Sequence, residues 1–234
     1  MRILRVSSNK GGVGKSVIAI NIAIDLENKG FNVLLIDADI TNSSIATYLG
    51  LANVKHTFLD ILKGKRSIDE CIMIHDTGLR YVVSSNKISQ YTTIVNGKQM
   101  HRLKRELLKL KYDYVIFDTA PGYILEDIAS LYNMAFIVTE PYTGSYISAL
   151  RLAKFYDKNN IEHMLIVNKI QNRSYELNIK EIEESYNSYI HKIPYDDNVN
   201  RSIQLQRPII IDKPNSKFSR SISRLSERVI KMSD

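Results

Sequence analysis

The chain has 234 residues, of which 44% are hydrophobic and 24% charged, which is the composition of a globular protein rather than a disordered one. Its single cysteine, Cys71, excludes an intramolecular disulfide, a CxxC redox pair and a cysteine-rich zinc site. The sequence has neither an apolar run of membrane-spanning length nor a signal-peptide pattern, so we expect a cytoplasmic protein.

The net charge of +7 is concentrated in two segments. Residues 98–111 contain six Lys or Arg against one acidic residue, and residues 198–234 contain eight against three. Such segments either indicate an anionic partner, such as nucleic acid or lipid headgroups, or form solvated helix faces.

Six short apolar runs predict buried strands, with amphipathic stretches of helical length between most of them. The expected strands are Ile3–Ser7, Val33–Ile36, Leu79–Val83, Tyr114–Phe117, Ala135–Thr139 and His163–Val167. The expected helices are Val17–Asn28, Gln99–Leu110, Ser145–Tyr156, Ile179–Tyr186 and Phe218–Met232. This alternation predicts one α/β domain over residues 1–234, with a mostly parallel twisted sheet and helices on both faces. Ligands of such sheets bind at the carboxyl ends of the strands.

The first predicted strand runs into residues 9–16, NKGGVGKS, and then into a helix. The glycines allow the backbone to curl, so that several N–H groups face one anion with the helix N-terminus behind it. In this P-loop arrangement Lys15 reaches the phosphates of a nucleotide, and the Ser16 hydroxyl is a ligand for Mg²⁺. The general pattern has glycine at position 9, whereas this chain has Asn9 followed by an additional lysine, Lys10.

Residues 10–16, KGGVGKS, resemble the deviant Walker A motif of the MinD/ParA ATPases. The resemblance implies a P-loop NTPase fold, ATP or ADP with Mg²⁺ as cofactors, and a homodimer that forms around ATP. It also implies that Lys10 reaches the partner's nucleotide, as an arginine finger would. The loop residues that it implies in nucleotide binding are Lys10, Gly11, Gly12, Val13, Gly14, Lys15, Ser16 and Val17. Within the family, residues 37–50 look most like archaeal MinD-type proteins.

Two aspartate-containing segments extend the resemblance. Residues 35–41, LIDADIT, resemble the family's switch I, which implies that Asp39 orients the attacking water and belongs to the metal site; otherwise Asp37 and Asp39 merely cap the end of a strand. Residues 114–122, YVIFDTAPG, resemble the Walker B and switch II region, where Asp118 would hold Mg²⁺. The implied catalytic residues are therefore Lys10, Lys15 and Asp39, and the implied metal residues are Ser16, Asp39 and Asp118.

The base-binding side is implied by two later segments. Residues 165–171, LIVNKIQ, have Gln171 where the N-K-x-D motif of GTPases has an aspartate that reads guanine, which argues against GTP. In the resembling family Asn168 would contact adenine, although it can also be a strand-end turn residue. Residues 193–196, IPYD, resemble the family's I-P-x-D segment, which would place Pro194 and Asp196 beside the base.

The last predicted helix combines an apolar stripe with a basic one. Phe218, Ile222, Leu225 and Val229 form the apolar stripe, and Arg220, Arg224, Arg228 and Lys231 lie on roughly the opposite face. No membrane-targeting helix follows before Asp234, so we expect this helix and residues 98–111 to bind DNA without sequence specificity, in preference to a membrane. The protein would then be cytoplasmic and nucleoid-associated.

Together these patterns predict a slow, partner-stimulated ATPase that switches between an ATP-bound dimer and an ADP-bound monomer, in intracellular positioning or DNA partitioning. Its activator protein and its cargo are not readable from the sequence. Three alternatives remain: a regulatory module that binds nucleotide with negligible turnover, a membrane-associated MinD-like spatial regulator, and an ATP-dependent metabolic ligase on the same fold.

Overall fold

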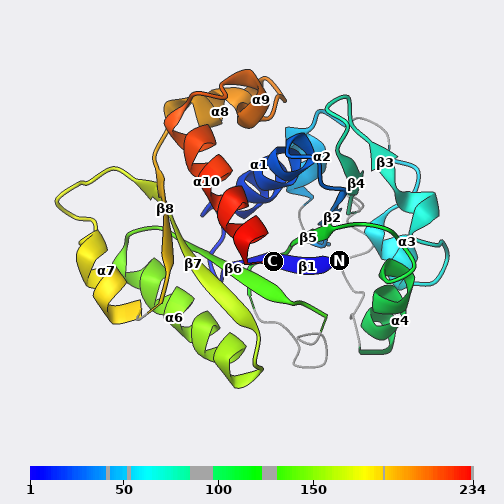
Figure 1. Ribbon diagram of the computed structural model, residues 1–234, viewed down its shortest axis with the longest axis horizontal. Helices are drawn as coiled ribbons and strands as arrows, with labels where there is room; N and C mark the ends of the chain where they lie inside the picture. Colours follow the sequence, from blue (N-terminus) through cyan, green and yellow to red (C-terminus); the bar gives the residue numbers. More distant parts are fainter. Residues whose placement is uncertain (41–42, 52–53, 85–96, 123–130, 187, 233–234) are drawn as a thin grey trace.

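A computed structural model describes residues 1–40, 43–51, 54–84, 97–122, 131–186 and 188–232 (Figure 1). In these residues eight strands form one sheet in the order β3-β4-β2-β5-β1-β6-β7-β8. The strands are β1 (Arg2–Ser7), β2 (Val33–Asp37), β3 (Met73–Ile74), β4 (Arg80–Val82), β5 (Tyr114–Asp118), β6 (Met134–Thr139), β7 (Glu162–Ile170) and β8 (Ile190–Pro194). Each neighbouring pair is parallel apart from β3 with β4, which confirms the predicted mostly parallel sheet.

Helices cover both faces of the sheet. They are α1 (Lys15–Asn28), α2 (Ser44–Tyr48), α3 (Phe58–Leu62), α4 (Gly97–Leu107), α6 (Thr143–Lys158), α7 (Ile179–Tyr186), α8 (Asp197–Gln204), α9 (Ile209–Asp212) and α10 (Lys217–Lys231), with a short 3₁₀ helix at Asp69–Cys71. One buried cluster joins α1, α2, α9 and α10 to one face, and two others join α3 with α4, and α6 with α7, to the other face. Within β1, Leu4 belongs to the first of these clusters and Ile3 to the second, as the two-residue period of a strand requires. Because the sheet is buried on both faces, its central strands are mostly apolar.

All six predicted strands and all five predicted helices are present, within a few residues of the expected bounds. Two strands were missed. The two-residue strand β3 leaves Ile74 66% exposed, and β8 carries His191 and Lys192 inside its apolar run. The helices α2, α3 and α9 were also missed, because four or five residues are too few to show a helical period in the sequence. Helix α8 was missed because Val199 and Ile203 are its only apolar residues.

The terminal helix α10 differs from the prediction at one residue. Its predicted apolar residues are all buried: Phe218, Ile222, Leu225 and Val229. Arg220, Arg224 and Lys231 are exposed as expected, but the guanidinium of Arg228 lies 3.6 Å from the centre of the Tyr189 ring and is only partly exposed. Arg228 is therefore packed against the protein rather than part of a free basic face. Among the described helices, none combines the length and the apolar composition needed to cross a bilayer.

The strand order determines where a ligand site can form. The central strand β1 lies between β5 and β6, and β5 lies between β1 and β2. Since these strands are parallel, the loops that follow β1, β2 and β5 emerge at the same edge of the sheet. The residues singled out in the sequence lie in these loops, at the start of α1, and at or just after the ends of β5, β7 and β8.

Candidate functional site

The loop between β1 and α1 has the curvature that its glycines allow. Gly12 and Gly14 adopt φ values of +77° and +101°, in the left-handed region that side chains rarely occupy. A Cβ at Gly14 would also collide with the amide nitrogen of Asn168, so only glycine fits there. Helix α1 begins at Lys15, directly after the loop. The result is a ring of backbone N–H groups at a helix N-terminus, the usual architecture of a phosphate site.

A cleft of about 600 Å³ opens over this loop. It is lined by predicted site residues of the loop and of the segment after β2: Gly11, Gly12, Gly14, Lys15, Ser16, Val17 and Asp39. The structure thus brings these predicted residues together. The cleft also contains residues that the sequence did not single out, among them Tyr48 of α2 and Ile203 of α8. Thr41, at the end of the switch I-like segment, lies outside the described residues.

Lys15 lies in a strongly charged environment. Its side chain is largely buried, and this burial lowers the pKa of its ammonium below the usual value, although Asp118 and Asp39 act in the opposite direction. Asp39 sits at the same cleft, and its N–H donates to the Asp37 carboxylate at 3.1 Å. A lysine ammonium in a cleft beside a phosphate-type loop is suited to binding the oxygens of a phosphate group.

Two carboxylates stand side by side at the ends of β2 and β5. Asp37 and Asp118 are partners in the strand register and are 0% and 1% exposed. Burial raises the pKa of Asp118 to about 7, against the effect of a hydrogen bond from the Ser16 side chain. Burial and the neighbouring Asp118 also raise the pKa of Asp37 well above its usual value, although the Ser43 hydroxyl donates to it at 2.7 Å.

These groups fit a magnesium ion. The Oδ1 atom of Asp118, next to Ser16, is buried without a hydrogen-bond partner, and Ser16 and Asp39 contribute hard oxygen atoms at the cleft over the loop. Among the described residues, no group of three His, Cys, Asp or Glu side chains could hold a metal by itself. Magnesium is usually bound by one or two carboxylates together with the phosphates of a substrate, which is the arrangement that this donor set allows.

The first residues of the loop are fastened to α6. The Asn9 amide donates to the carbonyl of Ser148 at 3.1 Å, and the Lys10 N–H donates to the Ser8 hydroxyl at 3.0 Å. The ammonium of Lys10 lies so close to Gly144, at the start of α6, that a Cβ there would stand 3.2 Å from it. Asn9, where the general pattern has glycine, therefore serves as a link between the loop and α6 in this chain.

A second, smaller pocket of about 150 Å³ lies beside the loop, between the ends of β7 and β8 and helix α8. It is lined by the predicted residues Gly12, Gly14, Val17, Asn168, Pro194 and Asp196, and also by Lys169, Val199, Ile203 and Phe218. The sequence motif on β7 and that on β8 therefore meet at the same place, next to the phosphate loop. An apolar pocket with a few polar groups at its rim is suited to a flat heterocycle.

The carboxylate of Asp196 is fully engaged by the chain's own donors. As the N-cap of α8 it accepts from the N–H and the side-chain amide of Asn198, at 3.0 and 2.7 Å, and from the N–H of Phe218 at 3.1 Å. Burial alone would raise the pKa of Asp196, but these hydrogen bonds hold it below its usual value. Asp196 thus ties β8, α8 and α10 together at the rim of the pocket.

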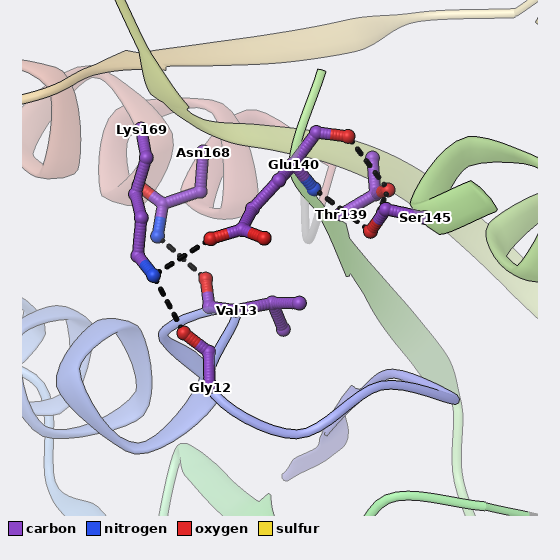
Figure 2. A network of polar contacts seen from close by, with 7 residues as sticks. All are labelled: Gly12, Val13, Thr139, Glu140, Ser145, Asn168 and Lys169. Carbon is purple, nitrogen blue, oxygen red and sulfur yellow. Dashed lines mark hydrogen bonds and ion pairs between the residues drawn. The ribbon is translucent and has the colours of Figure 1, made fainter. Parts of the chain in front are cut away.

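The end of β7 contacts the phosphate loop through two consecutive side chains (Figure 2). The Asn168 amide donates to the carbonyl of Val13 at 2.8 Å, and the Lys169 ammonium donates to the carbonyl of Gly12 at 2.6 Å. Lys169 also forms an ion pair with Glu140, at 2.7 Å, after the end of β6. Neither Lys169 nor Glu140 was predicted, because their contact joins two strand ends that no local motif connects.

A larger cleft, of about 760 Å³, lies between α6 and α7 near His163. None of the predicted site residues lines it. The chemistry-bearing motifs therefore gather at the smaller clefts over the phosphate loop, and these form the candidate site.

Comparison with known proteins shows what the chain is similar to. Residues 1–142 match the family model described as an AAA domain. A septum site-determining protein MinD assigned in Oltmannsiellopsis viridis is 29% identical over 245 residues, which cover 100% of this chain and 77% of that protein.

Solved structures show the same fold. The septum site-determining protein MinD of Pyrococcus horikoshii, complexed with Mg-ADP, superposes with a TM-score of 0.90 at 22% identity, over 99% of this chain and 97% of that one. A ParA family ATPase of Chlorobium tepidum superposes with a TM-score of 0.82 at 22% identity, over 97% of each chain.

Proposed function

The chain belongs to the AAA domain family and, with it, to the MinD/ParA ATPases, and from that membership we propose that it is a nucleotide-dependent switch that dimerises around ATP and hydrolyses it slowly. One observation carries the proposal. A glycine-curled loop and the buried Lys15 line one cleft, and Asp118, a buried carboxylate that has an unpartnered oxygen, interacts with Lys15 and with the Ser16 side chain of that cleft. The two nucleotide states would then present different surfaces to partners.

Each group at the cleft has a role in this proposal. Lys15 and the N–H groups of the loop bind the phosphates, while Ser16 and Asp118 hold Mg²⁺. Magnesium, when bound, would offset the negative charge that develops during phosphoryl transfer. Asp39, at the rim of the same cleft, orients the attacking water through its carboxylate.

The amide of Asn168 supports adenine as the base. Its nitrogen donates to the Val13 carbonyl, so the oxygen of the same amide remains as an acceptor at the smaller pocket. An acceptor suits the exocyclic amine of adenine better than the O6 carbonyl of guanine. Gln171, in place of the guanine-reading aspartate of GTPases, argues in the same direction. We therefore expect ADP to bind more tightly than GDP.

Substitution of Lys10 tests whether the protein acts as a dimer. In this structure its ammonium lies against Gly144 of its own chain, so it must leave this position to reach a partner's nucleotide. We expect Lys10→Ala to keep its affinity for ADP, because Lys15 and the loop N–H groups remain. It should lose ATP-dependent dimerisation and about 1,000-fold or more of its hydrolysis, the range found for arginine fingers supplied in trans.

The measurement combines calorimetry with ADP, light scattering with ATP, and steady-state ATPase assays. Lys65→Ala, at an exposed lysine after α3, is the control. A Lys10→Ala protein that dimerises and hydrolyses ATP like the parent would remove the role in trans. A wild-type protein that binds ATP and Mg²⁺ with negligible turnover, with and without DNA, lipid or cell extract, would favour a regulatory binding module instead.

DNA is the surface partner that we propose. The exposed lysines and arginines of α4 and α10 suit a phosphate backbone, but these helices lie on opposite faces of the sheet and so make two separate surfaces (Figure 1). Charge reversal should therefore be tested separately on each. One variant would combine Lys98→Glu and Arg105→Glu on α4 with Lys109→Glu just after it, and the other would combine Arg220→Glu with Arg224→Glu on α10.

Arg228 is left unchanged in these variants, because its guanidinium packs on Tyr189. Binding to unrelated duplexes should be equal and should weaken steeply with salt. The salt slope should fall by about 3 for the three substitutions, or by about 2 for the two on α10, whichever surface binds DNA. ATP-dependent sedimentation with anionic liposomes, and none with DNA, would instead support a membrane-associated regulator. Only DNA binding would imply that the protein associates with the nucleoid.

A further inference from the structure

The end of β7 departs from regular strand geometry at Lys169. Successive side chains of a strand point to opposite faces, so Asn168 and Lys169 would ordinarily point away from each other. Lys169 instead has a φ of +61°, and the pairing of β7 with β8 shifts register between Val167 and Ile170. As a result, both side chains point toward the phosphate loop (Figure 2).

These two side chains hold two consecutive peptide groups of the loop. Lys169 binds the carbonyl of Gly12, and Asn168 binds the carbonyl of Val13. In a planar trans peptide the C=O and the following N–H point in opposite directions. Holding the Gly12 carbonyl toward β7 therefore turns the N–H of Val13 away from β7, and holding the Val13 carbonyl does the same to the N–H of Gly14. Two N–H groups of the ring thus take their direction from the end of β7.

Glu140 holds the Lys169 ammonium that binds the Gly12 carbonyl. Its carboxylate lies 2.7 Å from Lys169, and its own N–H donates to the Ser145 hydroxyl at 3.2 Å, at the start of α6. The Thr139 hydroxyl donates to the same Ser145 oxygen at 2.9 Å (Figure 2). Glu140 therefore sits on a hydrogen-bonded turn between β6 and α6, which gives the ammonium a fixed counter-ion.

Stability alone does not account for this arrangement. The side chains of Lys169 and Glu140 are 39% and 21% exposed, and an ion pair so accessible to water adds little to the free energy of folding. A non-glycine residue with positive φ is strained, and such strain gathers where function requires a particular orientation.

We propose that Lys169 is a positioning residue for phosphate binding, which orients the Val13 N–H through the Gly12 carbonyl, with Glu140 as its counter-ion. The inference rests on the proposed nucleotide site. Lys169 also lines the smaller pocket, but the proposed effect is its bond to the Gly12 carbonyl and not a contact with the base. The effect of Lys169 and Glu140 passes through the backbone of the loop.

The test compares ADP affinity with the melting temperature of the nucleotide-free protein. Lys169→Met removes the bond to the Gly12 carbonyl and should weaken ADP binding about 10- to 100-fold, the range for one charge-assisted hydrogen bond. Lys169→Gly should weaken it as much, yet melt at the same or a higher temperature, because glycine relieves the positive φ. Lys169→Arg keeps a charged donor and should recover most of the affinity.

Glu140 provides a second measurement. Glu140→Gln should weaken ADP binding only a few-fold, because the amide oxygen still accepts from Lys169. In the Lys169→Met protein, adding Glu140→Gln should instead restore part of the affinity, because the carboxylate there has lost its counter-ion. This opposite sign in the two backgrounds is expected only if the two residues act as one unit.

Two control variants match the two changes. Lys192→Met breaks the 2.8 Å ion pair between Lys192 of β8 and Glu183 of α7. Asn172→Gly relieves a φ of +60° just after β7. Neither residue lines the two clefts over the loop, and both variants should bind ADP like the parent.

The outcomes separate the two levels of the argument. Normal ADP binding by Lys169→Met, or a fall in melting temperature of Lys169→Gly in proportion to its loss of affinity, would overturn the positioning role alone. Failure of the wild-type protein to bind ADP at all would overturn the proposed function, and this inference with it.

Discussion

The phosphate end and the base end of the candidate site satisfy their carboxylates in different ways. At the phosphate end, Asp118 is buried with one oxygen unpartnered, and its pKa is raised to about 7. At the base end, Asp196 accepts three hydrogen bonds from the chain, and its pKa is lowered. The charged form of Asp118 therefore destabilises the folded protein, whereas that of Asp196 stabilises it.

This contrast indicates which part of the site depends on a ligand. Burying a charge without a partner costs free energy, and a cation that binds there recovers this cost. The base end is instead already built by internal hydrogen bonds, from Asn168 to the loop and from Asp196 to α8 and α10. We therefore expect substitutions at the phosphate end to change chemistry and metal binding, and those at the base end to change stability.

The largest effect is expected for Asp39→Ala, at the phosphate end. Hydrolysis should fall about 100-fold or more, the usual contribution of a positioned acid or base, while ATP and Mg²⁺ still bind. The ATP-bound dimer should then persist, which light scattering after addition of ATP would detect. Hydrolysis at the parental rate would mean that another group orients the water.

Asp118→Asn should act on the metal. The variant keeps the shape of the side chain but loses its charge, so the gain in ADP affinity on adding Mg²⁺ should shrink about 10- to 100-fold. The same change should raise the melting temperature of the metal-free protein at pH 8, because a buried charge is removed. Calorimetry with and without Mg²⁺, and thermal melts, measure the two effects. A lower melting temperature would contradict the idea that the Asp118 charge destabilises the metal-free protein.

Asp196→Ala should act mainly on stability. Loss of the α8 cap leaves the N–H groups of Asn198 and Phe218 without their acceptor, which should reduce the free energy of unfolding by about 1–2 kcal/mol. Urea denaturation would measure this, with Asp196→Asn, which keeps an acceptor, as the control. If ADP affinity falls while stability does not, the carboxylate acts on the base directly.

The smallest effect concerns pH and the packing behind the base end. Burial lowers the pKa of His191 on β8 to about 4, and its ring lies 2.9 Å from the Ser221 carbonyl of α10, with Arg224 and Arg228 nearby. The neutral ring is therefore favoured in the folded state. Its contribution is fully present above the unfolded value of about 6.5 and is lost as the pH falls from there toward 4.

Between pH 6.5 and pH 5.5 this linkage should cost about 1 kcal/mol of unfolding free energy. His191→Gln should flatten this part of the stability profile, which denaturation at a series of pH values would show. An unchanged slope in the variant would assign the acid sensitivity to other groups.

The features of the fold and site that could be predicted from the sequence are those that short, local motifs encode. The loop at residues 9–16 and the strands on either side of it are local patterns, and the structure has them where they were expected. The smaller pocket was also foreseen, because Asn168, Pro194 and Asp196 each belong to a short motif.

The missed features depend on tertiary geometry. Glu140, the partner of Lys169, is 29 residues away in the sequence. Their contact also depends on the positive φ of Lys169, which a lysine in the sequence does not indicate. The pairing of Asp37 with Asp118 follows from the strand register, although the D-x-D sequence at positions 37–39 was a usable signal. The stacking of Arg228 on Tyr189 depends on how α10 lies over β8, which helical periodicity does not reveal.

The central position of β1 has a consequence for how the chain is made. Arg2 pairs with Tyr114, and Leu4 pairs with Met134, so the first strand to be synthesised has both of its neighbours far along the chain. At about 5–20 residues per second, β1 and the phosphate loop behind it emerge on the order of ten seconds before the strands that flank them. Until then an apolar strand with two unpaired edges is exposed. The nascent chain therefore carries its nucleotide loop early but completes it late, and during that interval β1 is the segment most in need of protection from aggregation.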